Sequence, residues 1–219
     1  MRRMLLFPAL LMLAACGGGP KKSVRIALPL PPKLDLTDYS FVYFPGFITE
    51  TRNENFEPDI EALNYFRREF IRKNIIGVIE KGPTDLSDKD AREFFEREQP
   101  FFKTMNIEQS EETLAVTGAI SFEVLDRSGF RQVQHTDISG RSFYRTQFVE
   151  VTGFDLTMRV YVYDLEGKLL YTESLKDSID VEGESFDERV VFYELLTRIS
   201  NQVLGLFSNT VVKAERSLL

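Results

Sequence analysis

The sequence has one cysteine (Cys16), one histidine (His135) and no tryptophan. A single cysteine cannot form an internal disulfide, so the fold must depend on its hydrophobic core. A single histidine excludes a metal cage built from several histidines. His135 lies near Asp137 and Ser139, but sequence neighbours rarely form a catalytic triad, so we expect a solvated loop histidine. Dinucleotide-binding and Walker-type glycine motifs are absent as well. We therefore predict a protein that is not an enzyme, with no catalytic residue, no cofactor and no metal.

Carboxylates are abundant, with 34 Asp and Glu residues, and they leave two minor alternatives open. One acidic stretch could bind calcium through oxygen ligands, although it lacks the spacing of an EF-hand loop. A pair of carboxylates could hydrolyse glycans, but nothing in the sequence singles out a pair. The residues of the acidic stretch are Asp177, Asp180, Glu182, Glu184, Asp187 and Glu188.

The N-terminus combines a positive charge, a short apolar run and small residues. Arg2 and Arg3 precede the apolar run, and Leu13-Ala14-Ala15 then leads into Cys16. These features are typical of a secretory signal. The run is too short for a membrane-spanning helix, which takes about 20 residues. The stretch resembles a bacterial lipoprotein signal with its lipobox. That resemblance implies cleavage before Cys16 and attachment of fatty acids such as palmitate to Cys16, whereas the plainer alternative is an ordinary signal with a chance cysteine.

The expected lipid anchor determines the predicted localisation and domain boundaries. Several acyl chains hold a protein stably on a membrane, whereas one chain binds marginally. Gly17 stands where an aspartate would usually signal retention in the inner membrane, so the resemblance implies an outer-membrane protein facing the periplasm. We expect a signal peptide over residues 1–15, a lipidated cysteine with tether and proline-rich strap over 16–37, and one periplasmic domain over 38–219.

The chain as a whole is acidic. Without Arg2 and Arg3, 25 basic residues face 34 acidic ones, a formal charge of −9. An acidic chain argues against nucleic acid and against adhesion to anionic lipid through charge. The membrane is expected as a partner only through Cys16.

Hydrophobic periodicity predicts an α+β fold. We expect a mixed sheet of about five strands, made of one β-α-β unit and a three-strand antiparallel meander, packed by a long C-terminal helix and one or two others. Ser185 and Glu188 suggest a capping box for that last helix. Strands are expected over residues 39–44, 75–79, 114–124, 143–164 and 168–175; helices from Pro58, from Ser87 and over 186–207; loops over 46–57 and 177–184; and a frayed hairpin over 130–141.

Aromatic residues crowd the predicted meander. Tyr161 and Tyr163 alternate with Val160 and Val162, so they lie on the face opposite the valines. If the last helix covers the aliphatic face, the tyrosines are exposed and mark a binding surface. If another helix covers them, they are core residues. We name a candidate partner-binding surface of Tyr161, Tyr163 and Tyr171.

The order of elements is similar to that of small periplasmic lipoproteins with the TolB N-terminal-like α/β fold. The likeness covers most of residues 39–207 and includes the hairpin Asp164-Leu165-Glu166-Gly167-Lys168. It implies non-enzymatic partner binding in the envelope and carries no functional residue over. We expect an adaptor or accessory subunit in envelope assembly or transport, with an envelope protein as partner and a homo-oligomer left open. The alternative is a carrier or sensor of an apolar ligand.

Overall fold

The structure, a computed structural model, describes residues 23–84, 86, 89–97, 107, 110–183 and 186–217. They form two compact units that divide after Leu30 and before Asn209. In one unit, β1 (Ser23–Leu30) pairs antiparallel with β10 (Thr210–Ser217), with Ser23 opposite Ser217. The other unit comprises residues 31–208. Cys16 and the rest of the expected signal and tether lie outside the described residues.

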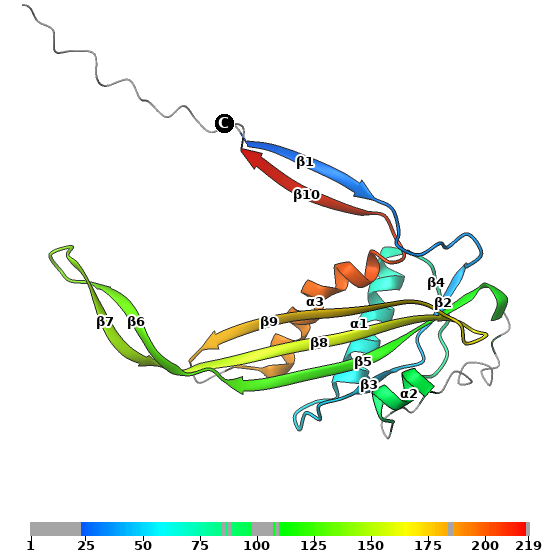
Figure 1. Ribbon diagram of the computed structural model, residues 1–219, viewed down its shortest axis with the longest axis horizontal. Helices are drawn as coiled ribbons and strands as arrows, with labels where there is room; N and C mark the ends of the chain where they lie inside the picture. The colour runs from blue at the N-terminus through cyan, green and yellow to red at the C-terminus, as the bar shows by residue number, and fades with distance from the viewer. Residues whose placement is uncertain are drawn as a thin grey trace, which may run out of the picture. The chain divides into compact units, whose positions relative to one another are not determined.

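The larger unit is built on a six-stranded mixed sheet with strand order β4-β2-β5-β8-β9, and β3 pairs with β5 (Figure 1). β2 runs parallel to β4 and β5, whereas β5, β8 and β9 form an antiparallel meander. The predicted α+β class is thereby confirmed. The strands are β2 (Phe41–Tyr43), β3 (Phe47–Thr49), β4 (Gly77–Val78), β5 (Thr113–Asp126), β8 (Val151–Asp164) and β9 (Leu169–Glu182).

Two helices, α1 (Pro58–Lys73) and α3 (Glu188–Leu204), pack on one face of the sheet. α1 begins at Pro58. Proline has no backbone N–H, so it leaves no donor without a partner in the first turn. The helix ends at Asn74, which adopts the left-handed conformation. Its acidic first turn and basic last turn complement the helix dipole. Between helices and sheet lies the main core, in which Phe192 contacts both Phe56 and Phe122.

The opposite face of the sheet is covered over part of its length by α2 (Ala91–Arg97) and neighbouring segments. Phe94 packs there with Ile48 and Ala119, while Phe95 stacks on Tyr161 with ring centroids 4.2 Å apart. Beyond this cover, the same face of β5 continues with Ser121 and Glu123, which are not buried. The sheet therefore has one face on which two helices pack and one that is partly open.

A second two-stranded sheet extends the β5–β8 hairpin. β6 (Gly129–Thr136) and β7 (Ser142–Val149) pair antiparallel, and Figure 1 shows them beyond the ends of β5 and β8. We call residues 129–149 the ribbon. The hairpin suggested over 130–141 is thus real but longer, and the expected strand over 143–164 is two strands, β7 and β8, in different sheets.

Other element predictions need correction. The predicted loop over 46–57 contains β3, a strand of only three residues that follows Pro45 and Gly46. The predicted loop over 177–184 is largely β9, where Leu175, Ile179 and Val181 face the core between polar residues. α3 begins later than expected, because the Asp187 side chain accepts bonds from the backbone N–H groups of Arg189 and Val190. Ser185, the expected cap, lies outside the described residues, as does Ser87.

No helix among the described residues is long and apolar enough to cross a membrane.

Candidate functional site

The ribbon has two chemically different faces. Side chains alternate across each strand, and cross-strand partners share a face. The register therefore places on one face a set without charge: Phe130, Gln132, Gln134, Thr136, Ser142, Tyr144, Thr146 and Phe148. The other face, which we call the basic face, holds Arg131, Val133, His135, Phe143, Arg145 and Gln147.

Both faces expose aromatic side chains. Phe130 is 77% exposed, Tyr144 69%, Phe148 54% and Phe143 49%. On the uncharged face the rings of Phe130 and Phe148 meet edge to face at 5.5 Å, and on the basic face His135 stacks on Phe143 at 5.7 Å. These rings pack mainly on each other across the ribbon. A two-stranded hairpin is marginally stable alone in water, so a ribbon with uncovered aromatic residues is typical of a surface that another molecule covers.

The tip of the ribbon is an ordered turn that presents Ile138 fully to solvent. The Asp137 carboxylate accepts bonds from the backbone N–H groups of Ser139 and Arg141 and from the Ser139 hydroxyl. These bonds lower the pKa of Asp137, and the bond from the Ser139 hydroxyl has the largest effect. Gly140 takes a positive φ of 82°, which closes the turn. The apex is therefore organised before any partner arrives, which reduces the entropy lost on binding.

At its root the ribbon is fastened to the sheet by Arg127. The guanidinium donates to both carboxylate oxygens of Asp155, at 2.6 and 2.7 Å, and to Asp180 at 2.6 Å. The Arg127 backbone N–H donates to the carbonyl of Val151. Arg131, inside the ribbon, forms a looser pair with Glu182 at 3.5 Å. Together these contacts limit how the ribbon pivots on β8 and β9.

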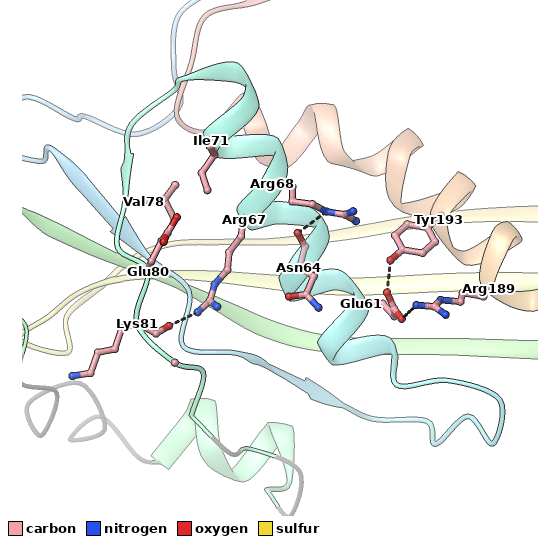
Figure 2. Close-up of a pocket in the computed structure, with 11 residues that line it drawn as sticks. Glu61, Asn64, Arg67, Arg68, Ile71, Val78, Glu80, Lys81, Arg189 and Tyr193 are labelled. Carbon is pink, nitrogen blue, oxygen red and sulfur yellow. Dashed lines mark hydrogen bonds and ion pairs between the residues drawn. The ribbon is translucent and has the colours of Figure 1, made fainter.

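A groove of about 690 Å³ lies along α1 (Figure 2). Two of its charged residues, Arg67 and Glu61, are occupied in structural bonds. Arg67 donates to the carbonyls of Phe44 and Lys81, both at 2.8 Å, and burial lowers the pKa of Arg67. Glu61 accepts bonds from Arg189 and from the Tyr193 hydroxyl. Burial and, after it, this bond raise the pKa of Tyr193. The groove thus joins α1 to α3 and to the segment after β4.

A second groove of about 590 Å³ lies on the open part of the sheet face. Its lining includes Ser121, Arg127, Asp155, Thr157 and Lys176. It therefore adjoins the root of the ribbon.

The structure does not bring the three predicted tyrosines together. Tyr163 is 6% exposed and belongs to a small core with Tyr43 and Ala115. Tyr161 is half-buried beneath Phe95 of α2. Tyr171 packs instead against the main core on the opposite face, with Lys33 over its ring at 5.8 Å. Phe95 belongs to the helix expected from Ser87, but the sequence did not indicate that this helix would cover Tyr161.

The acidic stretch is also dispersed by the fold. Asp177 pairs with Arg198 at 3.9 Å, Asp180 with Arg127, and Glu182 with Arg131. Asp187 caps α3, and Glu188 accepts a bond from Asn53. Glu184 lies outside the described residues. No group of three or more His, Cys, Asp and Glu side chains in the described ranges is arranged to hold a metal ion.

Residues 130–141 are mostly polar, and for that reason Phe130 and Ile138 were not predicted as site residues. The signal that could have found them is the combination of these apolar residues with Phe143, Tyr144 and Phe148 on both sides of the turn Asp137-Ile138-Ser139-Gly140. A tight turn with apolar residues on both sides, and with polar residues between them on both faces, predicts a hairpin whose apolar side chains are exposed.

No family model matches this chain, and no curated protein matches it. Among solved structures, the chain is similar to hypothetical protein CT253 from Chlamydia trachomatis, with a TM-score of 0.45 and 15% identity over 77% of this chain and 98% of that one. A PelC dodecamer from Paraburkholderia phytofirmans gives a TM-score of 0.36 and 11% identity over 85% and 100% of the two chains. A protein of Helicobacter pylori described as a neuraminyllactose-binding hemagglutinin homolog gives a TM-score of 0.33 and 11% identity over 80% and 81%.

Proposed function

We propose that this protein is a lipid-anchored periplasmic adaptor of the outer membrane, which binds a protein partner through its ribbon and catalyses no reaction. The single observation that carries the proposal is the ribbon itself: an ordered two-stranded element with exposed aromatic side chains on both faces. Exposure of these rings to water is unfavourable, and the free energy falls when a partner covers them. The role is that of an accessory subunit in envelope assembly or transport.

Two charged groups of the larger groove have structural roles, which favours a binding role over a catalytic one. Arg67 and Glu61 hold neighbouring segments together, so a substrate would have to displace bonds that maintain the fold. On the ribbon, by contrast, Arg141 and Arg145 are exposed and form no ion pair with any residue that the structure describes.

Anchorage rests on Cys16 and its lipobox, and it has its own test. Cells that express the chain are given a radioactive or clickable fatty acid, and the purified chain is examined for label. We expect label in the wild type and none in Cys16→Ser, with both chains exported. Label that persists in Cys16→Ser would remove the anchor from the account.

The binding role is tested by photo-crosslinking in living cells. A photoreactive residue replaces Tyr144 on the ribbon or, as a control of similar exposure to solvent, Ser174 on β9. We expect Tyr144 to give a reproducible crosslink to one envelope protein, with the linked peptide identified by mass spectrometry, and Ser174 not to give it. Equal products from both positions, or none from Tyr144, would reject the ribbon as the binding element.

A further inference from the structure

The charge of the ribbon is opposite to that of the rest of the chain. Residues 129–149 contain three arginines and one aspartate, a formal charge of +2. The other residues contain 24 basic and 33 acidic side chains, a formal charge of −9. Within the ribbon, the only carboxylate is that of Asp137, which is occupied by hydrogen bonds in the tip turn. The ribbon is therefore a basic element on an acidic protein.

The ribbon arginines are largely available for a partner. Arg141 and Arg145 form no ion pair with any residue that the structure describes, and both are exposed. Arg131 has only the 3.5 Å pair with Glu182 and remains 45% exposed. Arginine is enriched at binding hot spots, because its planar group can bind carboxylates with two hydrogen bonds and stack on rings. Here Arg131 and Arg145 flank Val133, His135 and Phe143 on one face.

We propose that the ribbon inserts into an acidic, apolar groove of its partner protein. This inference rests on the proposed function and specifies the chemistry of the partner. Carboxylates on one wall of the groove bind Arg131 and Arg145 on the basic face, with Arg141 at the tip. The other wall is apolar and contacts Phe130, Tyr144 and Phe148 on the uncharged face. Ile138, held forward by the tip turn, enters the end of the groove.

A protein groove fits this ribbon better than a lipid surface does. A bilayer covers only one face of a ribbon that lies on it, whereas here both faces carry exposed aromatic side chains. The −9 charge of the remaining chain also opposes approach to anionic lipid. Eight residues per strand at about 3.3 Å each give the ribbon a length of about 26 Å, which suits insertion between two walls.

The test uses the full-length chain and the purified envelope protein that Tyr144 crosslinks. Its affinity is measured for wild type, for Arg141→Glu/Arg145→Glu, and for the control Arg52→Glu/Arg68→Glu, which changes the net charge equally at exposed sites away from the ribbon. We expect roughly tenfold or greater weakening for the ribbon variant only, and a steep loss of wild-type affinity with added salt. Asp or Glu residues in the crosslinked peptide, changed to Lys, should restore binding to the ribbon variant.

Each other outcome has a defined meaning. If Phe130→Ser weakens binding while the charge reversal does not, the ribbon binds a partner but the acidic groove is wrong, and the proposed function survives. Equal weakening by the control variant would indicate a bulk charge effect and overturn the inference. Crosslinks from Tyr144 only to a second copy of this chain, or only to lipid, would overturn it as well.

Discussion

The guanidinium of Arg127 lies across the bare backbone of Gly153. A Cβ atom at Gly153 would be 2.4 Å from both Cδ and Nε of Arg127. Gly153 is opposite Asp180 in the sheet, and Asp155 lies two residues further along the same face, so the guanidinium reaches both carboxylates only by crossing this glycine. Because residue 153 has no side chain, Arg127 can reach both carboxylates and fasten the ribbon root to the sheet.

Gly153→Ala should release Arg127 without unfolding the sheet, because the clashing atoms are the flexible end of a side chain. Hydrogen exchange should become faster in the ribbon while Tm falls only slightly. Gly118→Ala is the matched comparison, since a Cβ there would be 2.0 Å from the carbonyl oxygen of Arg159. Backbone cannot yield so easily, and we expect a loss of about 3 kcal/mol or more in urea unfolding. Equal losses for the two variants would contradict this reading of the clamp.

Tyr163 should make the fold sensitive to alkali. Burial and the neighbouring Tyr161 raise the pKa of Tyr163 from 10.0 to about 12. Because the folded state disfavours the phenolate, this contribution is complete below pH 10 and is lost as the pH rises from 10 to about 12. A shift of this size corresponds to about 2–3 kcal/mol. Unfolding free energy measured across this range should fall less steeply in Tyr163→Phe than in wild type; parallel curves would show that Tyr163 is not the group responsible.

Phe192 is expected to be the most sensitive position on α3. It is fully buried against Phe56 and Phe122. Phe192→Ala should cost about 3–5 kcal/mol, because it removes a buried ring and leaves a cavity. Val190 lies on the same helix but is 62% exposed, so Val190→Ala should change stability by less than about 0.5 kcal/mol. Thermal and urea unfolding of the two variants provide the comparison, and similar costs would mean that α3 is not seated as described.

Arg67 and Arg68 are neighbours with different roles. Arg67→Met should cost about 1–3 kcal/mol, since it leaves the carbonyls of Phe44 and Lys81 without their donor. Arg68 is exposed. In the part of the chain that the structure describes, its side chain donates only to the carbonyl of Asn64 in its own helix. Arg68→Met should therefore be nearly neutral. Calorimetry would reveal the difference, and a neutral Arg67→Met would show that the groove is not held by this residue.

The sheet and its main core could be predicted from the sequence because their signals are local. The alternation from Leu114 to Phe122 and from Phe154 to Val162 identified both central strands and their buried faces. The proline at 58 marked the start of α1. Elements without such signals were missed or misplaced, notably β3, with three residues, and the last third of β9, where acidic residues hide the alternation of Ile179 and Val181.

The candidate site was less predictable, because it depends on which faces remain uncovered. Tyr161 and Tyr163 follow a good alternation, yet Phe95 of the seven-residue α2 covers Tyr161, and Tyr163 lies in the core beside it. Conversely, Phe130 and Phe148 look like core residues and are exposed, because no described layer packs over the ribbon. Periodicity indicates that a residue faces one side; only the packing decides whether that side is buried.

The central claim is that the ribbon binds the partner, and removing the ribbon tests it most directly. Residues 131–147 are replaced by Asn-Gly, which closes a two-residue hairpin between Phe130 and Phe148 and keeps the Arg127 clamp. The lipidated chain is extracted from cells in mild detergent, and the size of its native complex is measured beside its Tm. We predict an unchanged Tm and loss of the complex. A complex of unchanged size in the shortened chain would contradict the account.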